Sequence, residues 1–298
     1  MTKAPIPAVL FLAGLLAASP APAQDLEWQS YKGYDVPFVP TPYEVVEEML
    51  RLVDIKPGDV LYDLGCGDGR IVITAAKTYG IKAVGIDIDP VRIKESNENA
   101  AAAGLAGKVR FIQQDLFEAD FKDASVITMY LLTSVNMRLR PKLLEDLRPG
   151  TRLVSHSFGM GEWRPDKTSA VETPYGDERD VYFWVIPANV TGRWDWDLTM
   201  GSRTAHYVLE ADQEFQAVTA TVREGDWPVS VSEVRLSGDE ISFRIDAESD
   251  GKMVSWLYAG KVAGHRIRGA ARPAGDAKAA PVTWTATRNP MTIVAIAK

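Results

Sequence analysis

The residues whose spacing points most directly to chemistry lie at positions 59–70, which read Asp-Val-Leu-Tyr-Asp-Leu-Gly-Cys-Gly-Asp-Gly-Arg. An apolar run ends in Asp63 and passes directly into Gly65, Gly67 and Gly69. This pattern predicts a buried strand that turns tightly into a helix around a nucleotide-like ligand. The G-x-G-x-G spacing is one residue shorter at its end than the dinucleotide fingerprint, and no Gly-Lys-Ser/Thr follows it. A pyrophosphate is therefore not the ligand that this loop is expected to bind.

Four carboxylates are expected close to this loop. Asp63 and Asp68 lie within it, and Asp87 and Asp89 end a second apolar run, so a βαβ arrangement would bring all four to one loop mouth. Such a cluster repels phosphate and suits a ligand that carries an ammonium, a sulfonium and a ribose diol. S-adenosyl-L-methionine (SAM) has all three groups.

The order of these motifs resembles that of the class I SAM-dependent methyltransferases. In that family an acid opens the glycine-rich loop, a second acid ends the second strand and a third follows the third strand; the matching residues here are Asp63, Asp87 and Asp115. Asp87 lies 20 residues after Gly67, near the spacing at which an acid reaches ribose hydroxyls in doubly wound folds. The resemblance implies that Asp87 binds the ribose, that Asp115 accepts a hydrogen bond from the adenine amino group, and that the glycines approach the methionine part. Asp63 has an alternative role, which is to hold the loop amides.

The segment before the loop narrows the resemblance. Residues 34–49 read Tyr-Asp-Val-Pro-Phe-Val-Pro-Thr-Pro-Tyr-Glu-Val-Val-Glu-Glu-Met. Together with the glycine loop, this segment is similar to the small methyltransferase family that includes the lysine methyltransferase of the mitochondrial ATP synthase c subunit, over about residues 34–160. The likeness implies that Phe38 and Thr41 help to close the SAM pocket.

Two helix starts are also expected in this half of the chain. Thr41 and Glu44 have capping-box spacing ahead of a helix over residues 42–53, and helix initiation alone would account for both. Asp89 precedes Pro90 at a first helical position, which predicts that Asp89 caps a helix rather than binds a ligand.

Methyl transfer needs few acid or base groups, because the sulfonium is already activated and the main task is to hold a lone pair in line with the methyl carbon. Cys66 is predicted to pack, and the three histidines are too scattered for metal-ligand spacing, so no metal is expected.

Tyr130 ends the fourth expected strand, where many amine methyltransferases carry Asn-Pro-Pro-Tyr. Its aromatic face suits a cation, which makes Tyr130 the candidate catalytic residue. His156 ends the fifth strand and either contacts substrate, acts as a base or is a satisfied strand-end histidine; Ser134 is predicted to cap the next helix.

The elements expected to position these residues divide the chain in two. Residues 24–188 are expected to form an α/β domain, a Rossmann-like class I methyltransferase sheet. Its strands are expected at residues 59–64, 84–87, 109–112, 126–130, 153–156, 169–173 and 181–186, and its helices at residues 42–53, from 90 onward and at 135–147.

Residues 189–298 are expected to form a second, mostly antiparallel β domain, a barrel or a sandwich, because short period-2 segments alternate with Gly and Asp turns. Strands are expected at residues 205–209, 215–222, 231–236, 241–245, 254–258, 265–268, 282–287 and 292–296. The aromatic residues of this domain either line a ligand cavity or pack a small core, and packing is the more common case. The domain is interpreted as a binding or docking module of unknown partner.

Charge restricts the substrate. The chain has 298 residues, a net charge of −7 and a pI of about 5.2. Binding phosphates requires clustered Lys and Arg, so nucleic acid is not the expected substrate. A protein or a small amine remains.

The first 23 residues resemble a secretory signal peptide. Lys3 precedes an apolar run over residues 8–18, and Ala21-Pro-Ala23 fits a cleavage site. The run is too short to span a membrane comfortably, so no stable membrane insertion is expected after cleavage, and the mature protein is expected to be exported, to the periplasm. Two functions stay open: a SAM-dependent methyltransferase of a protein lysine or another amine, and an exported non-catalytic protein that binds SAM or another adenosyl compound.

Overall fold

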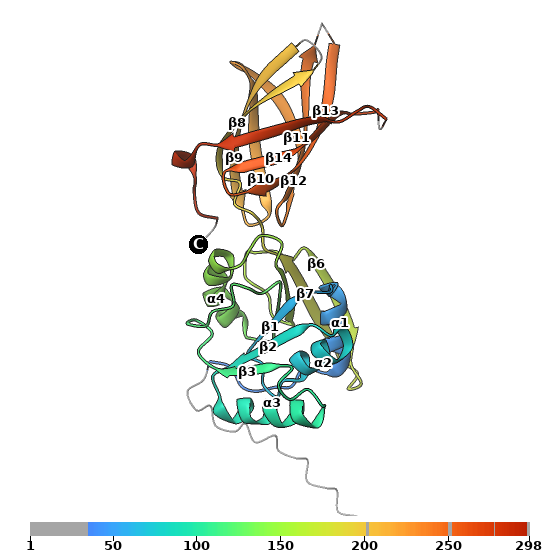
Figure 1. Cartoon of the computed structure of the whole chain (residues 1–298), viewed down its shortest axis with the longest axis vertical. Coiled ribbons are helices and arrows are strands. Elements are labelled where there is room, and N and C mark those ends of the chain that lie inside the picture. Colours follow the sequence, from blue (N-terminus) through green and yellow to red (C-terminus); the bar gives the residue numbers. More distant parts are fainter. Residues whose placement is uncertain (1–34, 201–202, 250–251, 277, 297–298) are drawn as a thin grey trace, which may run out of the picture. The chain divides into compact units, whose positions relative to one another are not determined.

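A mixed seven-stranded sheet is the framework of the first half of the chain (Figure 1). The computed structural model describes residues 35–200, 203–249, 252–276 and 278–296, so the expected signal peptide lies outside the described residues. The sheet order is β3-β2-β1-β4-β5-β7-β6. Its elements are α1 (Tyr43–Leu52), β1 (Val60–Leu64), α2 (Arg70–Tyr79), β2 (Lys82–Asp87), α3 (Pro90–Ala102), β3 (Arg110–Gln113), β4 (Val126–Met129), α4 (Thr133–Asp146), β5 (Arg152–His156), β6 (Lys167–Glu172) and β7 (Glu178–Val185).

Strands β1 to β5 run parallel, whereas β7 pairs antiparallel with β5 and β6 pairs antiparallel with β7. Helices α1, α2 and α3 contact one another in sequence along one face of the sheet, and α4 lies on the other face (Figure 1). This is the Rossmann-like methyltransferase sheet that the sequence predicted. None of the described helices is long and apolar enough to cross a membrane.

The alternation of side chains along the strands places polar groups at one edge of this sheet. Leu61, Val126 and Val154 pack against α1 and α2 in one apolar core. Successive side chains of a strand point to opposite faces, so the residues two positions further on face the same side as these three. Those residues are Asp63, Thr128 and His156, at or near the carboxyl ends of β1, β4 and β5. The core therefore fixes the direction in which the candidate site residues project.

The helix starts only partly follow the predictions. Asp89 caps α3 as expected, because its side chain accepts a hydrogen bond from the Val91 amide and Pro90 is the first helical residue. The predicted capping box of Thr41 is wrong, since α1 begins without a side-chain cap bond. The predicted cap by Ser134 is also wrong: α4 begins at Thr133, again without a side-chain cap bond.

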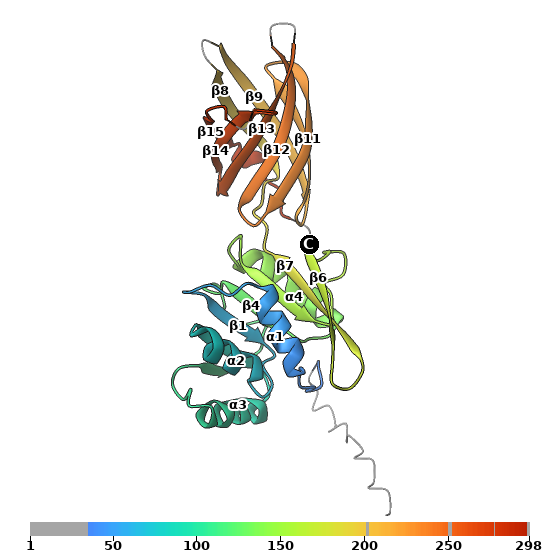
Figure 2. The ribbon, with the colours of Figure 1, turned by 90° about the vertical axis from the view of Figure 1, so that its right-hand side faces the viewer.

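The second half of the chain is a closed antiparallel barrel, with the order β10-β11-β12-β13-β14-β15-β8-β9 (Figure 2). Its strands are β8 (Gly192–Met200), β9 (Arg203–Glu214), β10 (Ala217–Glu224), β11 (Trp227–Ser237), β12 (Glu240–Ser249), β13 (Lys252–Ala263), β14 (Arg266–Pro273) and β15 (Val282–Arg288). Closure removes the unpaired edges that an open sheet would expose. The barrel alternative is the one that the structure shows.

Two predictions for the ends of the barrel need correction. Strand β8 was not predicted, although it closes the barrel by pairing with both β15 and β9. The strand predicted at residues 292–296 is wrong. A short 3₁₀ helix, Pro290–Thr292, occupies its start, where the Asn289 side chain accepts a hydrogen bond from the Met291 amide.

The barrel interior is filled by aromatic rings. Trp196, Tyr207, Phe243, Tyr258 and Trp284 are buried in its core, and the centroids of neighbouring rings lie 4.9–6.4 Å apart. These separations are those of packed aromatic pairs. These five side chains therefore pack the core of the barrel, and two of them, Phe243 and Tyr258, also line a groove.

Candidate cofactor and acceptor site

The glycine-rich loop joins β1 to α2 in the predicted strand-to-helix turn. Gly65, Gly67 and Gly69 have φ angles of 78°, 53° and 80°, a region that favours glycine. A Cβ atom on Gly67 would lie 2.4 Å from the Phe38 ring, and one on Gly65 would lie 2.7 Å from Leu131. We expected the spacing to mark backbone approach to a ligand; in the structure, backbone conformation and contacts with protein side chains already require glycine at these positions.

Asp87 holds the loop. Its Oδ2 accepts a hydrogen bond from the Gly67 amide at 2.9 Å, and its Oδ1 accepts one from the Asp89 amide at 2.9 Å. Burial raises the pKa of Asp87, and the two amide hydrogen bonds act in the opposite direction. Each carboxylate oxygen has a second lone pair, so Asp87 can accept further hydrogen bonds. The structure thus joins Asp87 to the glycine-rich loop through the Gly67 amide.

Asp63 lies deeper and makes a different contact. It is 2% exposed and accepts a hydrogen bond from the Thr128 hydroxyl at 2.7 Å. Burial raises the pKa of Asp63 to about 7, with smaller contributions from the carboxylates of Asp87 and Asp68. The alternative role predicted for Asp63 was to hold the loop amides. In the structure Asp87, not Asp63, accepts the hydrogen bond from the Gly67 amide. A cation beside Asp63 would favour its ionised form.

The other two carboxylates of the expected cluster are engaged elsewhere. Asp68 accepts a hydrogen bond from Arg70 Nε at 2.9 Å, and Asp89 caps α3. Arg70 also donates to the Thr41 carbonyl at 2.8 Å, which joins the loop to the segment before α1. The carboxylates of Asp87 and Asp68 raise the pKa of Asp63, and that of Asp89 raises the pKa of Asp87, so the predicted cluster is present. Within it Asp68 pairs with Arg70, and Asp89 caps α3 as predicted.

Asp115 follows β3, next to the end of β2. Its Oδ1 accepts a hydrogen bond from the Phe117 amide at 2.9 Å, and the Gln114 amide donates to the Asp87 carbonyl at 3.0 Å. Asp63, Asp87 and Asp115 consequently lie at the carboxyl ends of three neighbouring strands. In an open α/β sheet, this edge is where ligands bind.

Three aromatic rings stack beside these acids. The Tyr130 and His156 ring centroids are 3.8 Å apart with an interplanar angle of 28°, and the Phe158 ring lies 5.8 Å from Tyr130 on a roughly parallel plane. Tyr130 is half-buried, and burial raises the pKa of its hydroxyl. The three rings lie at and just after the ends of β4 and β5, where Tyr130 and Phe158 are partly exposed and His156 is buried.

His156, which ends β5, is buried beside Tyr130. It is 1% exposed, its Nδ1 lies 3.3 Å from the Thr41 hydroxyl, and its Nε2 has no hydrogen-bond partner in the part of the chain that is described. Burial lowers the pKa of His156 to about 4, with a further lowering by Arg179 that Asp177 opposes. The ring is therefore neutral at neutral pH. Thr41, which does not cap α1, contacts this histidine through its hydroxyl.

Asn136 follows Tyr130 closely enough in the sequence to be expected at the same edge, whereas Phe158 carried no sequence signal. Phe158 lies in the loop after β5, and its carbonyl accepts hydrogen bonds from Ser155 Oγ at 2.7 Å and Asn136 Nδ2 at 3.1 Å. These residues come from separate elements, and no motif joins them. Cys66 packs in the core beside α2, as predicted. The described residues include no group of three or more His, Cys, Asp or Glu side chains able to hold a metal.

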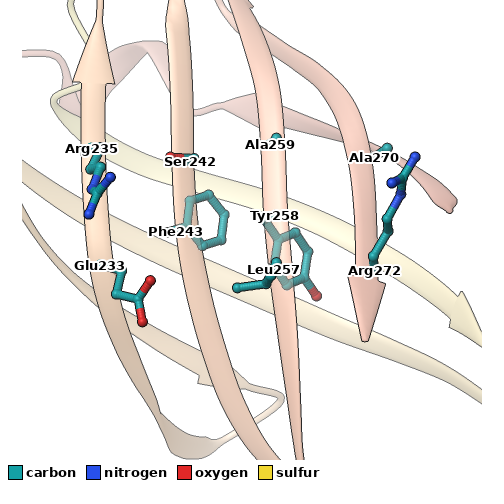
Figure 3. Close-up of a pocket in the computed structure, with 9 residues that line it drawn as sticks. All are labelled: Glu233, Arg235, Ser242, Phe243, Leu257, Tyr258, Ala259, Ala270 and Arg272. Atoms are coloured by element: carbon teal, nitrogen blue, oxygen red, sulfur yellow. The ribbon is translucent and has the colours of Figure 1, made fainter. Parts of the chain in front are cut away.

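A groove of about 420 Å³ lies on the barrel, apart from these residues (Figure 3). Its floor includes Ser242, Ala259 and Ala270 of three successive strands, and Arg235 and Arg272 flank it. All of its lining residues come from β11 to β14. The groove is therefore not part of the site at the sheet edge.

Comparison with known proteins identifies the sheet domain. The family model described as the ANTKMT methyltransferase domain matches residues 63–167. A protein-lysine N-methyltransferase of Saccharolobus islandicus is 46% identical over 152 residues, which are 51% of this chain and 94% of the relative. This chain belongs to that methyltransferase family. The sheet domain is a SAM-dependent methyltransferase, and SAM is its cofactor.

Further relatives share this domain only in part. The lysine N-methyltransferase of the ATP synthase c subunit from Homo sapiens is 31% identical over 51% of this chain and 65% of the relative. The adenine nucleotide translocase lysine N-methyltransferase of Mus musculus is 33% identical over 44% of this chain and 56% of the relative. A solved RNA methyltransferase of Salinibacter ruber in complex with S-adenosyl-L-homocysteine is 55% identical, covers 51% of this chain and 96% of its own, and has a TM-score of 0.48. The family match ends before the barrel begins.

Proposed function

We propose that the enzyme transfers the methyl group of SAM to the side-chain amine of a protein lysine or to another amine. The observation that carries the proposal is the flat stack of Tyr130, His156 and Phe158 beside the acids of β1 and β2. A neutral aromatic surface suits the polar cation of a methylated ammonium. The relatives from Saccharolobus islandicus and Homo sapiens are both lysine N-methyltransferases, which supports the same substrate class.

The residues at the sheet edge fit the cofactor. SAM supplies an activated methyl group when it is bound. We propose that Asp87 accepts hydrogen bonds from the ribose hydroxyls and that Asp115 accepts one from the adenine amino group. The positively charged part of the cofactor suits Asp63, whose carboxyl pairs with the Thr128 hydroxyl and with no cation among the described residues. Phe38 lies against Gly67 and is proposed to cover the loop with Thr41.

The residues proposed to contact the acceptor, Tyr130 and His156, orient the amine and are not required to transfer its proton. A lysine amine has a pKa near 10.4, so it must lose a proton before its lone pair can attack. The nitrogen then forms a bond to the methyl carbon while the carbon–sulfur bond breaks and its electron pair stays on sulfur. We propose that Tyr130 holds the amine along this line. Neutral His156 adds no positive charge that would repel the cationic reactants.

Methyl transfer by the mature chain tests the proposal. The protein is incubated with SAM labelled in its methyl group and, separately, with lysine-containing peptides, an envelope protein extract and total RNA. Label on protein that mass spectrometry places on lysine is the expected result. If calorimetry shows tight SAM binding but no methyl group is transferred, the protein is instead a non-catalytic SAM-binding protein. Label on RNA would overturn the exclusion of nucleic acid, which depends on the net charge of −7.

We also propose that the protein is exported after removal of residues 1–23. The support is the short apolar run behind Lys3 and the Ala-Pro-Ala sequence before Gln24. Expression of the whole chain in a bacterial host with an envelope tests this. The expected product, recovered from the periplasmic fraction, begins at Gln24 by intact-mass measurement. A product that retains Met1 in the cytosolic fraction would refute export.

A further inference from the structure

One turn of the barrel packs against the loop that follows β5 in the methyltransferase domain. Phe215 and Gln216 lie between β9 and β10. Gln216 Oε1 accepts a hydrogen bond from the indole of Trp163 at 2.8 Å, and Gln216 Nε2 donates one to the Arg164 carbonyl at 2.8 Å. The Phe215 ring stacks on Trp163 with centroids 5.6 Å apart and an interplanar angle of 10°. Trp163 is fully buried and Phe215 nearly so.

The backbone of this turn is held in a costly conformation. Phe215 has a φ angle of 52°, in the left-handed region that bulky residues seldom adopt. Such a conformation persists where surrounding contacts outweigh its cost. Here the ring is enclosed between Trp163 and the guanidinium of Arg140, which lies 5.1 Å from the ring centroid. Glycine would adopt this backbone conformation without strain. The contacts of the phenyl ring with Trp163 and Arg140 are therefore what offsets the strain at Phe215.

Arg140 contacts both the Phe215 ring and the loop after β5. It projects from α4 and donates hydrogen bonds to the Met160 carbonyl and to Glu162 Oε2, both at 2.8 Å. Trp163, at the end of the same loop, accepts a hydrogen bond from the Trp184 indole at its carbonyl, 2.9 Å away. Residues 160–163 are therefore fixed between the barrel turn on one side and the sheet on the other.

The same loop carries the outer ring of the acceptor stack. Phe158 precedes Met160 by two residues, and its ring lies 5.8 Å from Tyr130. Asn136, one turn of α4 before Arg140, donates hydrogen bonds to the carbonyls of Phe158 and Gly159 at 3.1 and 3.2 Å. Displacing Phe215 would release Arg140 and Trp163, and with them the loop that sets the position of Phe158.

We propose that Phe215 and Gln216 are positioning residues of the methyltransferase site, which act through the loop of residues 157–163 on Tyr130. The barrel then contributes to acceptor use directly, in addition to any partner that it binds. This inference rests on the proposed amine methyl transfer. It requires that changes at the turn alter the use of the acceptor and leave SAM binding intact, because the turn has no contact with Asp63, Asp87 or the glycine loop among the interactions of the described residues.

The test uses Phe215→Ala and Gln216→Glu in the otherwise unchanged chain. Gln216→Glu keeps an acceptor for Trp163, loses the donor to the Arg164 carbonyl and places a second carboxylate beside Asp166. Phe215→Tyr retains the stacked ring and is the rescue variant. The control is Trp227→Ala: this side chain is 78% exposed and lies at the opposite end of β10, about 25 Å along the strand at 3.3 Å per residue. For each protein, kcat and KM for the acceptor, the SAM dissociation constant and the unfolding midpoint are measured.

The expected result is a fall of at least fivefold in kcat/KM for the acceptor in Phe215→Ala, with SAM affinity within twofold of the parent. Phe215→Tyr and Trp227→Ala retain parental kinetics. Since contact along a chain of residues does not by itself prove coupling, the double variant with Phe158→Ala is included. Its loss should be clearly smaller than the product of the two single losses.

Three outcomes would overturn the inference. Folded Phe215→Ala and Gln216→Glu proteins with parental acceptor kinetics would show that the turn only joins the domains. Independent, multiplicative losses in the double variant would show that Phe215 does not act through Phe158. A parent protein that binds SAM but transfers no methyl group would remove the proposed function and this inference together. An insoluble Phe215→Ala leaves Gln216→Glu to decide, with a loss of at least twofold expected.

Discussion

Replacing Asp63 by Asn should change the pH dependence of stability in a defined direction. Asp63 is 2% exposed, and burial raises the pKa of its carboxyl from 3.8 to about 7 in the folded protein. Between these values the folded chain retains a proton that the unfolded chain has lost. Stability must then fall as the pH rises. Asn removes the titration while keeping an oxygen that can accept the hydrogen bond from Thr128.

The size of the effect follows from the shift. One pKa unit corresponds to about 1.4 kcal/mol, so a shift of roughly three units costs the parent about 4 kcal/mol of unfolding free energy between pH 4 and pH 7. The stability of Asp63→Asn relative to the parent should rise by that amount over this range and level off above pH 7. The buried Asn amide adds a constant offset, because its unmet hydrogen bonds do not depend on pH. His156, whose pKa is lowered to about 4, contributes the opposite slope between about pH 4 and 6.5 in both proteins, and this cancels in the difference.

Urea unfolding of both proteins at pH 4.5, 5.5, 6.5 and 7.5 measures the difference. The matched control is Asp226→Asn, the same change at an exposed aspartate in the turn between β10 and β11. A difference for Asp63→Asn that stays within about 1 kcal/mol across the series would show that the Asp63 carboxyl is ionised in the folded protein at neutral pH. The account of the site as a partly protonated acid awaiting a cation would then be wrong.

Three further variants examine the cofactor loop and the acceptor surface. Asp87→Ala should weaken SAM binding by roughly 1.5–3 kcal/mol, the range for lost hydrogen bonds to a charged group, and calorimetry that finds unchanged affinity would remove Asp87 from the site. Tyr130→Ala should lower single-turnover methyl transfer at least tenfold with SAM affinity within threefold, whereas Tyr130→Phe keeps the ring and should stay within threefold in transfer. Gly67→Ala should destabilise the protein by about 1–3 kcal/mol in urea, because its φ is 53° and its Cβ would overlap Phe38; an unchanged midpoint would contradict the packing described for the loop.

The parts of the site that the sequence predicts are those whose position follows from strand order. Asp63, Asp87 and Asp115 each follow an apolar run, and parallel strands end at the same edge of a sheet. The start of α3 was predictable for a local reason, since Asp89 and Pro90 make their contacts within two residues. Local pattern and sheet topology were sufficient for these elements.

The errors occurred where a distant contact decides the outcome. Thr41 has the spacing of a helix cap, yet its hydroxyl contacts His156, 115 residues away. Residues 292–296 have the composition of a strand, but the Val294 amide donates to the Thr191 hydroxyl and its carbonyl accepts from Asn189 and Thr191, so side chains replace a strand partner. Strand β8 is fixed by closure with β15, a pairing that its own residues do not specify. The stack of Tyr130, His156 and Phe158 and the turn at Phe215 belong to the same class.

The opposite shifts of Asp63 and His156 have one physical origin and one consequence. Burial disfavours the charged form of each group, so it raises the pKa of the acid to about 7 and lowers the pKa of the imidazole to about 4. Between those values both groups are neutral, and the sheet edge buries two titratable side chains without burying their charges. A cationic ligand breaks this symmetry: it pulls Asp63 toward its carboxylate form and opposes protonation of His156 further. Below about pH 7 the edge therefore gains most of its negative charge when a cation is present to neutralise it, and we propose that this favours a sulfonium cofactor over neutral adenosyl compounds.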